Sequence, residues 1–133
     1  MNSEKGFSLL ELMIVVAIIG LIVSIGYPSY TGYMQKTRRA DGVAALNHAA
    51  MVMESCRSDL ATYVGCDARV AAQSERGNYT LAPSGITASA YLLTATAVGV
   101  QAKDGKCATL TLTAQGTKGY TGTAPDVATC WGR

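Results

Sequence analysis

A long apolar run opens the chain, and it contains few polar positions. Residues 7–27 include thirteen of the Leu, Ile, Val and Phe kind and a single charge, Glu11. At a rise of ~1.5 Å per residue, a helix over this run is roughly 31 Å long, about the thickness of the hydrocarbon core of a bilayer. The run therefore predicts a membrane-spanning helix.

The pattern becomes periodic beyond Pro28. Apolar residues there recur at spacings of three and four, which marks one helical face: Val43, Leu46, Ala50, Met53 and Leu60. Pro28 and nearby glycines lower helix propensity without supplying a clear end. We therefore expect one helix from about Phe7 to about Cys56, kinked near Pro28 and amphipathic in its second half.

Strand patterns follow in the last third of the chain. Residues 91–100 are rich in β-formers, and residues 108–113 alternate apolar and polar side chains, so that one face packs inward. Between them, residues 103–106 contain an Asp-Gly pair, which tolerates the positive φ of a hairpin turn. A shorter third strand is expected within residues 116–122. Residues 59–89 show no sustained period and are expected to form a connecting loop, which completes an α+β prediction.

Four cysteines lie downstream of the apolar run: Cys56, Cys66, Cys107 and Cys130. An even number in an extracytoplasmic domain of this size indicates two disulfides, because such a domain buries little surface and benefits from covalent links. Of the three pairings, proximity in sequence favours Cys56 with Cys66 and Cys107 with Cys130. A zinc site is the alternative, but the sequence has no CxxC pair and His48 is its single histidine.

No pattern in the sequence supports catalysis, a cofactor or a metal. His48 has no nucleophile signature near it, and the carboxylates of the second half are scattered without calcium-loop spacing. From Pro28 onward there are ten Lys or Arg and seven Asp or Glu, spread along the sequence. That distribution favours a mixed solvated surface, and DNA binding would require the cations to converge on one face. Trp131 beside Cys130 is expected to cover a disulfide.

Glu11 is the unusual residue of the apolar run. Thirteen apolar residues favour the membrane by roughly 4 to 8 kcal/mol, against about 3 kcal/mol for one central carboxylate, so the helix is expected to insert. If the chain is cut after Gly6, the new amine of Phe7 stands four residues before Glu11, on the same helical face. The alternative for Glu11 is a tolerated polar residue near the membrane surface, and the alternative for cleavage is a signal peptidase site after Gly26.

Residues 6–20, GFSLLELMIVVAIIG, resemble the leader junction and helix start of type IV prepilins. The resemblance implies that a prepilin peptidase in the inner membrane cleaves between Gly6 and Phe7 and methylates the new amine. It also implies that Glu11 pairs with the amino terminus of a neighbouring pilin subunit, and that pilus assembly machinery handles the membrane-held precursor.

The end of the chain is similar to the tail of small PilE-type minor pilins, in residues 107–112, in residues 115–119 and in Cys130-Trp131. This likeness implies a type IV pilin-like fold with a carboxyl-terminal loop bounded by the Cys107–Cys130 disulfide. The expected organisation has four parts: a leader at 1–6, a membrane and filament-core half of the helix at 7–27, an amphipathic half at 28–56, and a loop, sheet and disulfide-bounded region at 57–133.

The disulfides indicate a carboxyl-terminal region outside the cytoplasm. The resemblance to prepilins implies that this region is periplasmic in the precursor and extracellular in the assembled pilus. A positive-inside count favours the opposite orientation, because Lys36, Arg38 and Arg39 follow the span. We expect these cations to reach phosphate head groups beside an aromatic belt of Tyr27, Tyr30 and Tyr33. The function predicted is that of a structural, minor pilin subunit rather than an enzyme. A type II secretion pseudopilin and a DNA-uptake receptor pilin are the alternatives.

Overall fold

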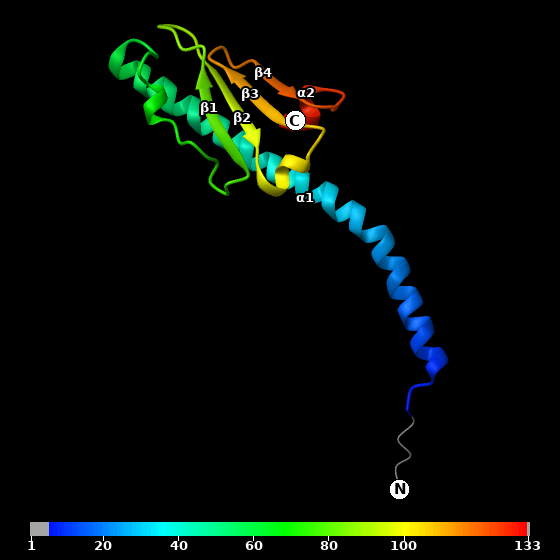
Figure 1. The fold of residues 1–133 in the computed structure, drawn as a ribbon. Helices are drawn as coiled ribbons and strands as arrows, with labels where there is room; N and C mark the ends of the chain where they lie inside the picture. Colours follow the sequence, from blue (N-terminus) through cyan, green and yellow to red (C-terminus); the bar gives the residue numbers. More distant parts are fainter. Residues whose placement is uncertain (1–5, 133) are drawn as a thin grey trace. The chain divides into compact units, whose positions relative to one another are not determined.

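The computed structural model describes residues 6–132 and divides into two compact units, one up to Met34 and the other from Gln35 onward. One helix, α1, runs from Leu9 to Leu60 and contributes to both units (Figure 1). The first unit is helical and carries the apolar run. The second unit contains the rest of α1 and the whole of the sheet.

The first part of α1 has no buried residue up to Tyr33. Pro28 lies inside the helix, and the hydroxyl of Thr31 donates to its carbonyl oxygen at 2.9 Å. The predicted helix is therefore present but shifted, since it begins at Leu9 and continues to Leu60. The leader residues 1–5 lie outside the described part of the chain.

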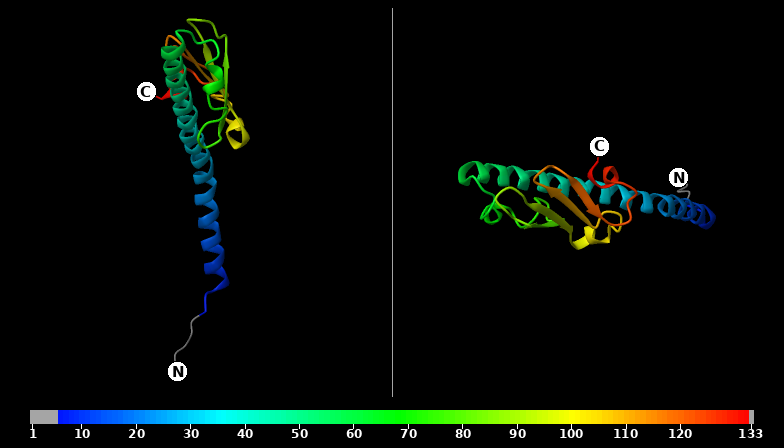
Figure 2. Two further views of the ribbon diagram at one scale, coloured as in Figure 1. Left: turned by 90° about the vertical axis from the view of Figure 1, so that its left-hand side faces the viewer. Right: turned by 90° about the horizontal axis from the view of Figure 1, so that it is seen from above.

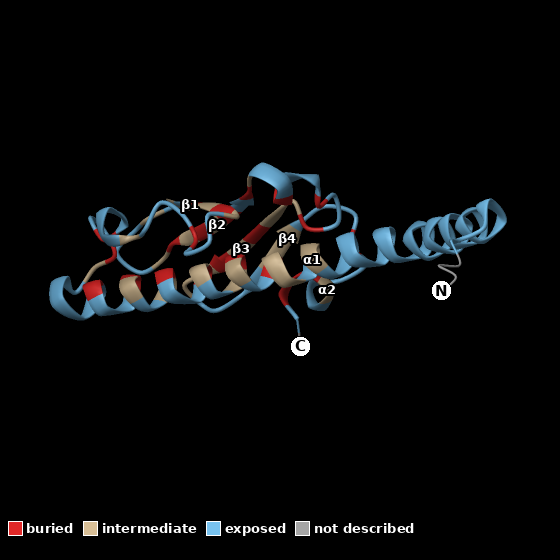
Figure 3. Ribbon diagram, turned by 90° about the horizontal axis from the view of Figure 1, so that it is seen from below, coloured by how far each residue is buried: buried red, intermediate tan, exposed pale blue. Residues whose placement is uncertain are grey.

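The second part of α1 is amphipathic, as its sequence pattern predicts. Its buried positions recur every three or four residues and face the sheet (Figure 3): Arg39, Gly42, Leu46, Ala49, Met53 and Cys56. A Cβ at position 42 would lie 2.9 Å from the Tyr79 ring. Gly42 therefore lets the aromatic ring pack directly on the helix backbone, which explains a glycine in mid-helix.

The sheet has four antiparallel strands in the order of the sequence: β1 (Tyr79–Ser84), β2 (Leu92–Ala97), β3 (Thr109–Thr113) and β4 (Lys118–Thr121). Figure 2 shows the sheet along one side of the second part of α1. Leu93, Ala95, Leu110 and other alternate residues point into the shared core, while the threonines of β3 stay half-exposed. The predicted α+β fold, a long helix on a small antiparallel sheet, is confirmed.

Two elements contradict the sequence-based expectations. β1 lies inside residues 59–89, which we expected to be a loop, and Pro83 within it pairs with Leu93. Proline is tolerated because β1 is an edge strand, where a missing N–H costs no ladder bond. A short helix, α2 (Val127–Trp131), also went unpredicted, although Asp126 caps it by accepting from the Thr129 N–H at 2.7 Å.

The turn between β2 and β3 is also different from the one expected. The Asp-Gly pair does not supply a positive φ at Gly105, and the positive value falls instead at Gly99, with φ of 59°. A 3₁₀ helix, η2 (Gly99–Lys103), follows, and Asp104 turns inward with 1% exposure. The connection is therefore a packed element rather than a simple hairpin turn.

Candidate processing and assembly site

The junction at Gly6 and Phe7 lies just before α1, in a segment without regular structure. Ser8 ends this segment, and its hydroxyl accepts a hydrogen bond from the Glu11 N–H at 3.1 Å, as a helix-capping serine does. Phe7 is 82% exposed. The bond between Gly6 and Phe7 therefore lies outside the helix, between two exposed residues.

Glu11 occupies the first turn of α1 and is exposed. A carboxylate there interacts favourably with the helix dipole. Within residues 6–132, no lysine or arginine forms an ion pair with Glu11. The described residues therefore leave its carboxylate without a lysine or arginine partner.

The apolar surface beyond Glu11 is open along its length. The large side chains from Leu9 to Ile25 are between 45% and 77% exposed. By length and composition α1 could cross a membrane, and none of its most apolar stretch is buried within the protein. Residues 6–132 therefore leave this surface open.

A buried ion pair in the second unit corrects the role expected of Arg39. The Arg39 Nε donates to Asp104 Oδ2 at 2.6 Å, and its Nη2 donates to Oδ1 at 2.8 Å. Its Nη1 also donates to the Thr129 carbonyl oxygen at 3.2 Å. The hydrogen bond to Asp104 raises the pKa of Arg39, so the arginine stays charged. Arg39 is thus a bidentate link between α1, η2 and α2, and it does not reach head groups.

Two disulfides close the second unit at its two ends. Cys56 and Cys66 are joined at 2.01 Å and tie the end of α1 to the following loop. Cys107 and Cys130 are joined at 2.06 Å and tie the start of β3 to α2. These are the pairs that proximity in sequence favours. Trp131 packs beside the second bridge with 7% exposure, and its indole N–H donates to the Gly119 carbonyl oxygen at 2.8 Å.

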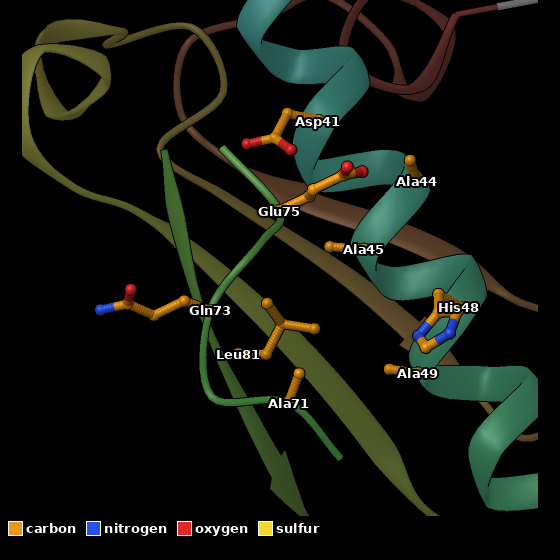
Figure 4. Close-up of a pocket in the computed structure, with 9 residues that line it drawn as sticks. All are labelled: Asp41, Ala44, Ala45, His48, Ala49, Ala71, Gln73, Glu75 and Leu81. Atoms are coloured by element: carbon orange, nitrogen blue, oxygen red, sulfur yellow. The ribbon is translucent and has the colours of Figure 1, made fainter. Parts of the chain in front are cut away.

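A groove of about 500 Å³ separates the exposed edge of α1 from the loop before β1 (Figure 4). Four of its nine lining residues are alanines, and His48 and Glu75 also line it. Asp41 at one end accepts from Ser74 Oγ at 2.6 Å and Asn78 Nδ2 at 3.0 Å. Burial by itself raises the pKa of Asp41, but these hydrogen bonds lower it below its usual value. Asp41 therefore holds the loop against α1 as a carboxylate.

Nothing in the described part of the chain gathers three His, Cys, Asp or Glu side chains that could hold a metal ion. His48 is exposed on α1, and the groove beside it contains no serine or cysteine nucleophile. The most distinctive features of the described residues are the exposed segment at Gly6 and Phe7 and the open apolar surface of α1.

Comparisons with known proteins point in the same direction. A family model described as "Type IV minor pilin ComP, DNA uptake sequence receptor" matches residues 28–111, and one described as "Prokaryotic N-terminal methylation motif" matches residues 1–27. The structure is similar to the non-core minor pilin PilV of Neisseria meningitidis, with a TM-score of 0.60 over 71% of this chain and 94% of that chain. At 19% identity, that likeness shows a shared fold.

Curated relatives are pilins as well. Fimbrial protein Q of Moraxella bovis is 35% identical over 74% of this chain and 61% of its own length. The type IV major alpha-pilin of the same organism is 47% identical, and a fimbrial protein of Pseudomonas aeruginosa is 51% identical, each over 38% of this chain. The matched region covers 33% and 34% of the last two. The predicted membership of the type IV pilins is confirmed, and because the minor pilin model spans more than half of the sequence, the chain belongs to the type IV minor pilin family of ComP.

Proposed function

We propose that this minor pilin is made as a membrane-held precursor, cleaved between Gly6 and Phe7, methylated at Phe7 and packed into a type IV pilus. The apolar first part of α1 serves both as the membrane anchor and as the surface that packs in the filament. A prepilin peptidase and the inner-membrane assembly machinery are the partners that this route requires. The sheet and both disulfides lie on the periplasmic side before assembly.

The exposed apolar surface from Leu9 to Ile25 is the observation that carries this proposal. Apolar surface in water costs roughly 25 cal/mol for each Å², so a surface this long needs a cover. Lipid supplies the cover in the precursor, since residues 9–27 of α1 rise about 29 Å, close to the thickness of the hydrocarbon core of a bilayer. The helices of other subunits supply it in the filament. A secretion pseudopilin would use the same surface, but the minor pilin family match favours the pilus.

Cleavage gives Glu11 its partner. The new amine at Phe7 has a reference pKa of ~7.7 to 8, so it carries positive charge at neutral pH for much of the time. It stands four residues before Glu11 in its own chain, and in a filament the amine of a neighbouring chain offers the same charge. An ion pair in an apolar filament core replaces a costly unpaired carboxylate, which favours the register that brings the two groups together.

Glu11→Ala is expected to be cleaved normally but to enter filaments poorly, because the amine then has no carboxylate partner. Pili sheared from cells and the remaining membranes are compared by immunoblot, with precursor and mature forms resolved by size. Glu75→Ala, which removes an exposed carboxylate of the second unit, is the matched control and should leave incorporation unchanged. Wild-type incorporation of Glu11→Ala would show that the carboxylate is incidental.

DNA uptake is the second candidate function, and the family model described as a DNA uptake sequence receptor is the observation that favours it. We propose that exposed cations of the second unit contact DNA phosphates. Arg69 is partly engaged with Asp59 at 3.1 Å, and Arg57 donates to the Tyr63 hydroxyl. The exposed lysines Lys103, Lys106 and Lys118 are the stronger candidates for phosphate contacts.

The full chain in detergent is expected to bind duplex DNA with a strong salt dependence, since each phosphate contact releases counterions. Fluorescence anisotropy over a range of salt concentrations measures the slope. Removal of one contacting lysine should lower the slope by about one. A flat and negligible binding curve would remove this candidate function and leave the proposal for the filament unaffected.

A further inference from the structure

The element η2 is fixed to the beginning of the second unit of α1. Gln101 is fully buried, and its Nε2 donates to the Gln35 carbonyl oxygen at 3.2 Å and to the Tyr79 hydroxyl at 3.1 Å. Asp104, just after η2, is held by the two hydrogen bonds from Arg39. These contacts place η2 beside Gln35 and keep it there as a packed element.

The outer side of η2 is apolar and basic. Val100 is 64% exposed, and Lys103 and Lys106 beside it are exposed too. Lys36, the residue after Gln35, adds another exposed cation on α1. We name these four residues the basal patch. Asp104 is paired with Arg39. Asp126, which lines a second groove together with Lys36, offsets only one of the three lysine charges, so the patch keeps a net positive charge.

Only a short stretch of helix separates the basal patch from the predicted membrane span, so the patch lies close to any membrane that holds the anchor. Gln35 follows Tyr27, the end of the predicted span, by eight residues of one continuous helix. Those residues rise about 12 Å, which is an upper limit on the distance of Gln35 from the hydrocarbon core, whatever the tilt of the helix. Head groups occupy about 5 to 8 Å of that distance on each side of a bilayer. Lysine side chains on η2 can extend toward the phosphates across the remainder.

We propose that the basal patch rests on anionic phospholipid head groups, with Val100 in the interfacial layer and the three lysines near lipid phosphates. This inference rests on the proposed function, because it requires the anchor to be inserted. Buried Gln101 and Asp104 hold η2 to α1, so the contact fixes the folded unit against the membrane before assembly. Entry into a filament then has to break the contact.

Valine methyl groups test the contact without a change in the sequence. The full chain is prepared with labelled valine methyl groups in nanodiscs of phosphatidylglycerol and phosphatidylcholine that contain a lipid with a nitroxide on its head group. Paramagnetic broadening is compared at Val23 in the anchor, Val100 in the basal patch and Val64, which is 57% exposed. Val64 lies beside the Cys56–Cys66 bridge, and Cys56 is about 31 Å along α1 from Gln35.

Broadening is expected at Val23 and Val100, and at Val100 it should exceed that at Val64 by at least about threefold, as their distances from the head groups require. Lys36→Glu with Lys103→Glu should reduce the broadening at Val100 to the level at Val64. Lys118→Glu is the matched control and should leave the broadening at Val100 unchanged. Lys118 pairs with Leu112, at the end of β3 that is far from Lys106. Nanodiscs of phosphatidylcholine alone should weaken the effect.

The three valines separate the ways in which the proposal can fail. Equal and weak broadening at Val100 and Val64, with strong broadening at Val23, would overturn the membrane contact and leave the anchor intact. Absence of broadening at Val23 would overturn the proposed anchor itself, and the contact with it. Broadening at Val100 that survives the double charge reversal would also contradict the proposal, because the lysines would then play no part.

Discussion

Asp104→Ala is expected to lower the free energy of unfolding by about 3 to 5 kcal/mol, the usual cost of removing one partner from a buried ion pair. Its carboxylate side chain is fully buried and takes two hydrogen bonds from Arg39 and one from Gln101. Without the carboxylate, the guanidinium group remains in a site with little access to water. Urea unfolding of the full chain in detergent, followed by the fluorescence of Trp131, measures the loss.

Two further variants test whether the loss of stability comes from the buried ion pair. Asp67→Ala removes an exposed carboxylate from a 3₁₀ helix and should change stability by less than about 0.5 kcal/mol. Arg39→Met combined with Asp104→Ala should recover part of the loss, because no unpaired charge is then buried. A double variant that loses as much as the sum of its two single changes would contradict this explanation.

Gly6→Leu is expected to leave nearly all of the protein as an uncut precursor in the membrane. A peptidase has to enclose the extended backbone at the cleaved bond, and a bulky side chain in place of the glycine hydrogen obstructs that approach. The structure itself would accept the change, because nothing lies within 4 Å of a Cβ at this position. A failure of processing would therefore reflect recognition and not folding, and immunoblots of precursor and mature forms would reveal it.

Gly26→Leu is the control for this experiment, and it also tests the alternative of a signal peptidase site. A Cβ at position 26 likewise meets nothing within 4 Å. We expect normal cleavage after Gly6 in this variant. Loss of processing in Gly26→Leu, with normal processing in Gly6→Leu, would move the cleavage site to Gly26 and overturn the assignment of the leader.

Sequence reasoning located the elements that have long and regular patterns. The uniform run and the later spacing of three and four predicted α1, and the alternation around Leu110 and Leu112 predicted β3. It missed β1 because only Tyr79 and Leu81 alternate before Pro83, and a proline argues against a strand unless its edge position is known. It missed α2 because five residues are too few to show a period.

The polar contacts of the interior were outside the reach of sequence patterns. Arg39 and Asp104 are 65 residues apart, and each has a reasonable local explanation, one as a cation after a span and the other as part of a turn. Only the packing of η2 against α1 brings them together. The proposed cleavage residues Gly6 and Phe7 and the proposed assembly residue Glu11 differ in this respect, because their pattern is local and the sequence displays it directly.

The intact mass of the protein recovered from sheared pili tests the proposed processing and assembly most directly. We predict the mass of residues 7–133 with one added methyl group at the Phe7 amine and two hydrogens fewer for each of the Cys56–Cys66 and Cys107–Cys130 bridges. The same mass should be found in filaments and in the processed membrane fraction. A chain in the filament that still begins at Met1, or one that begins at Tyr27, would contradict the account.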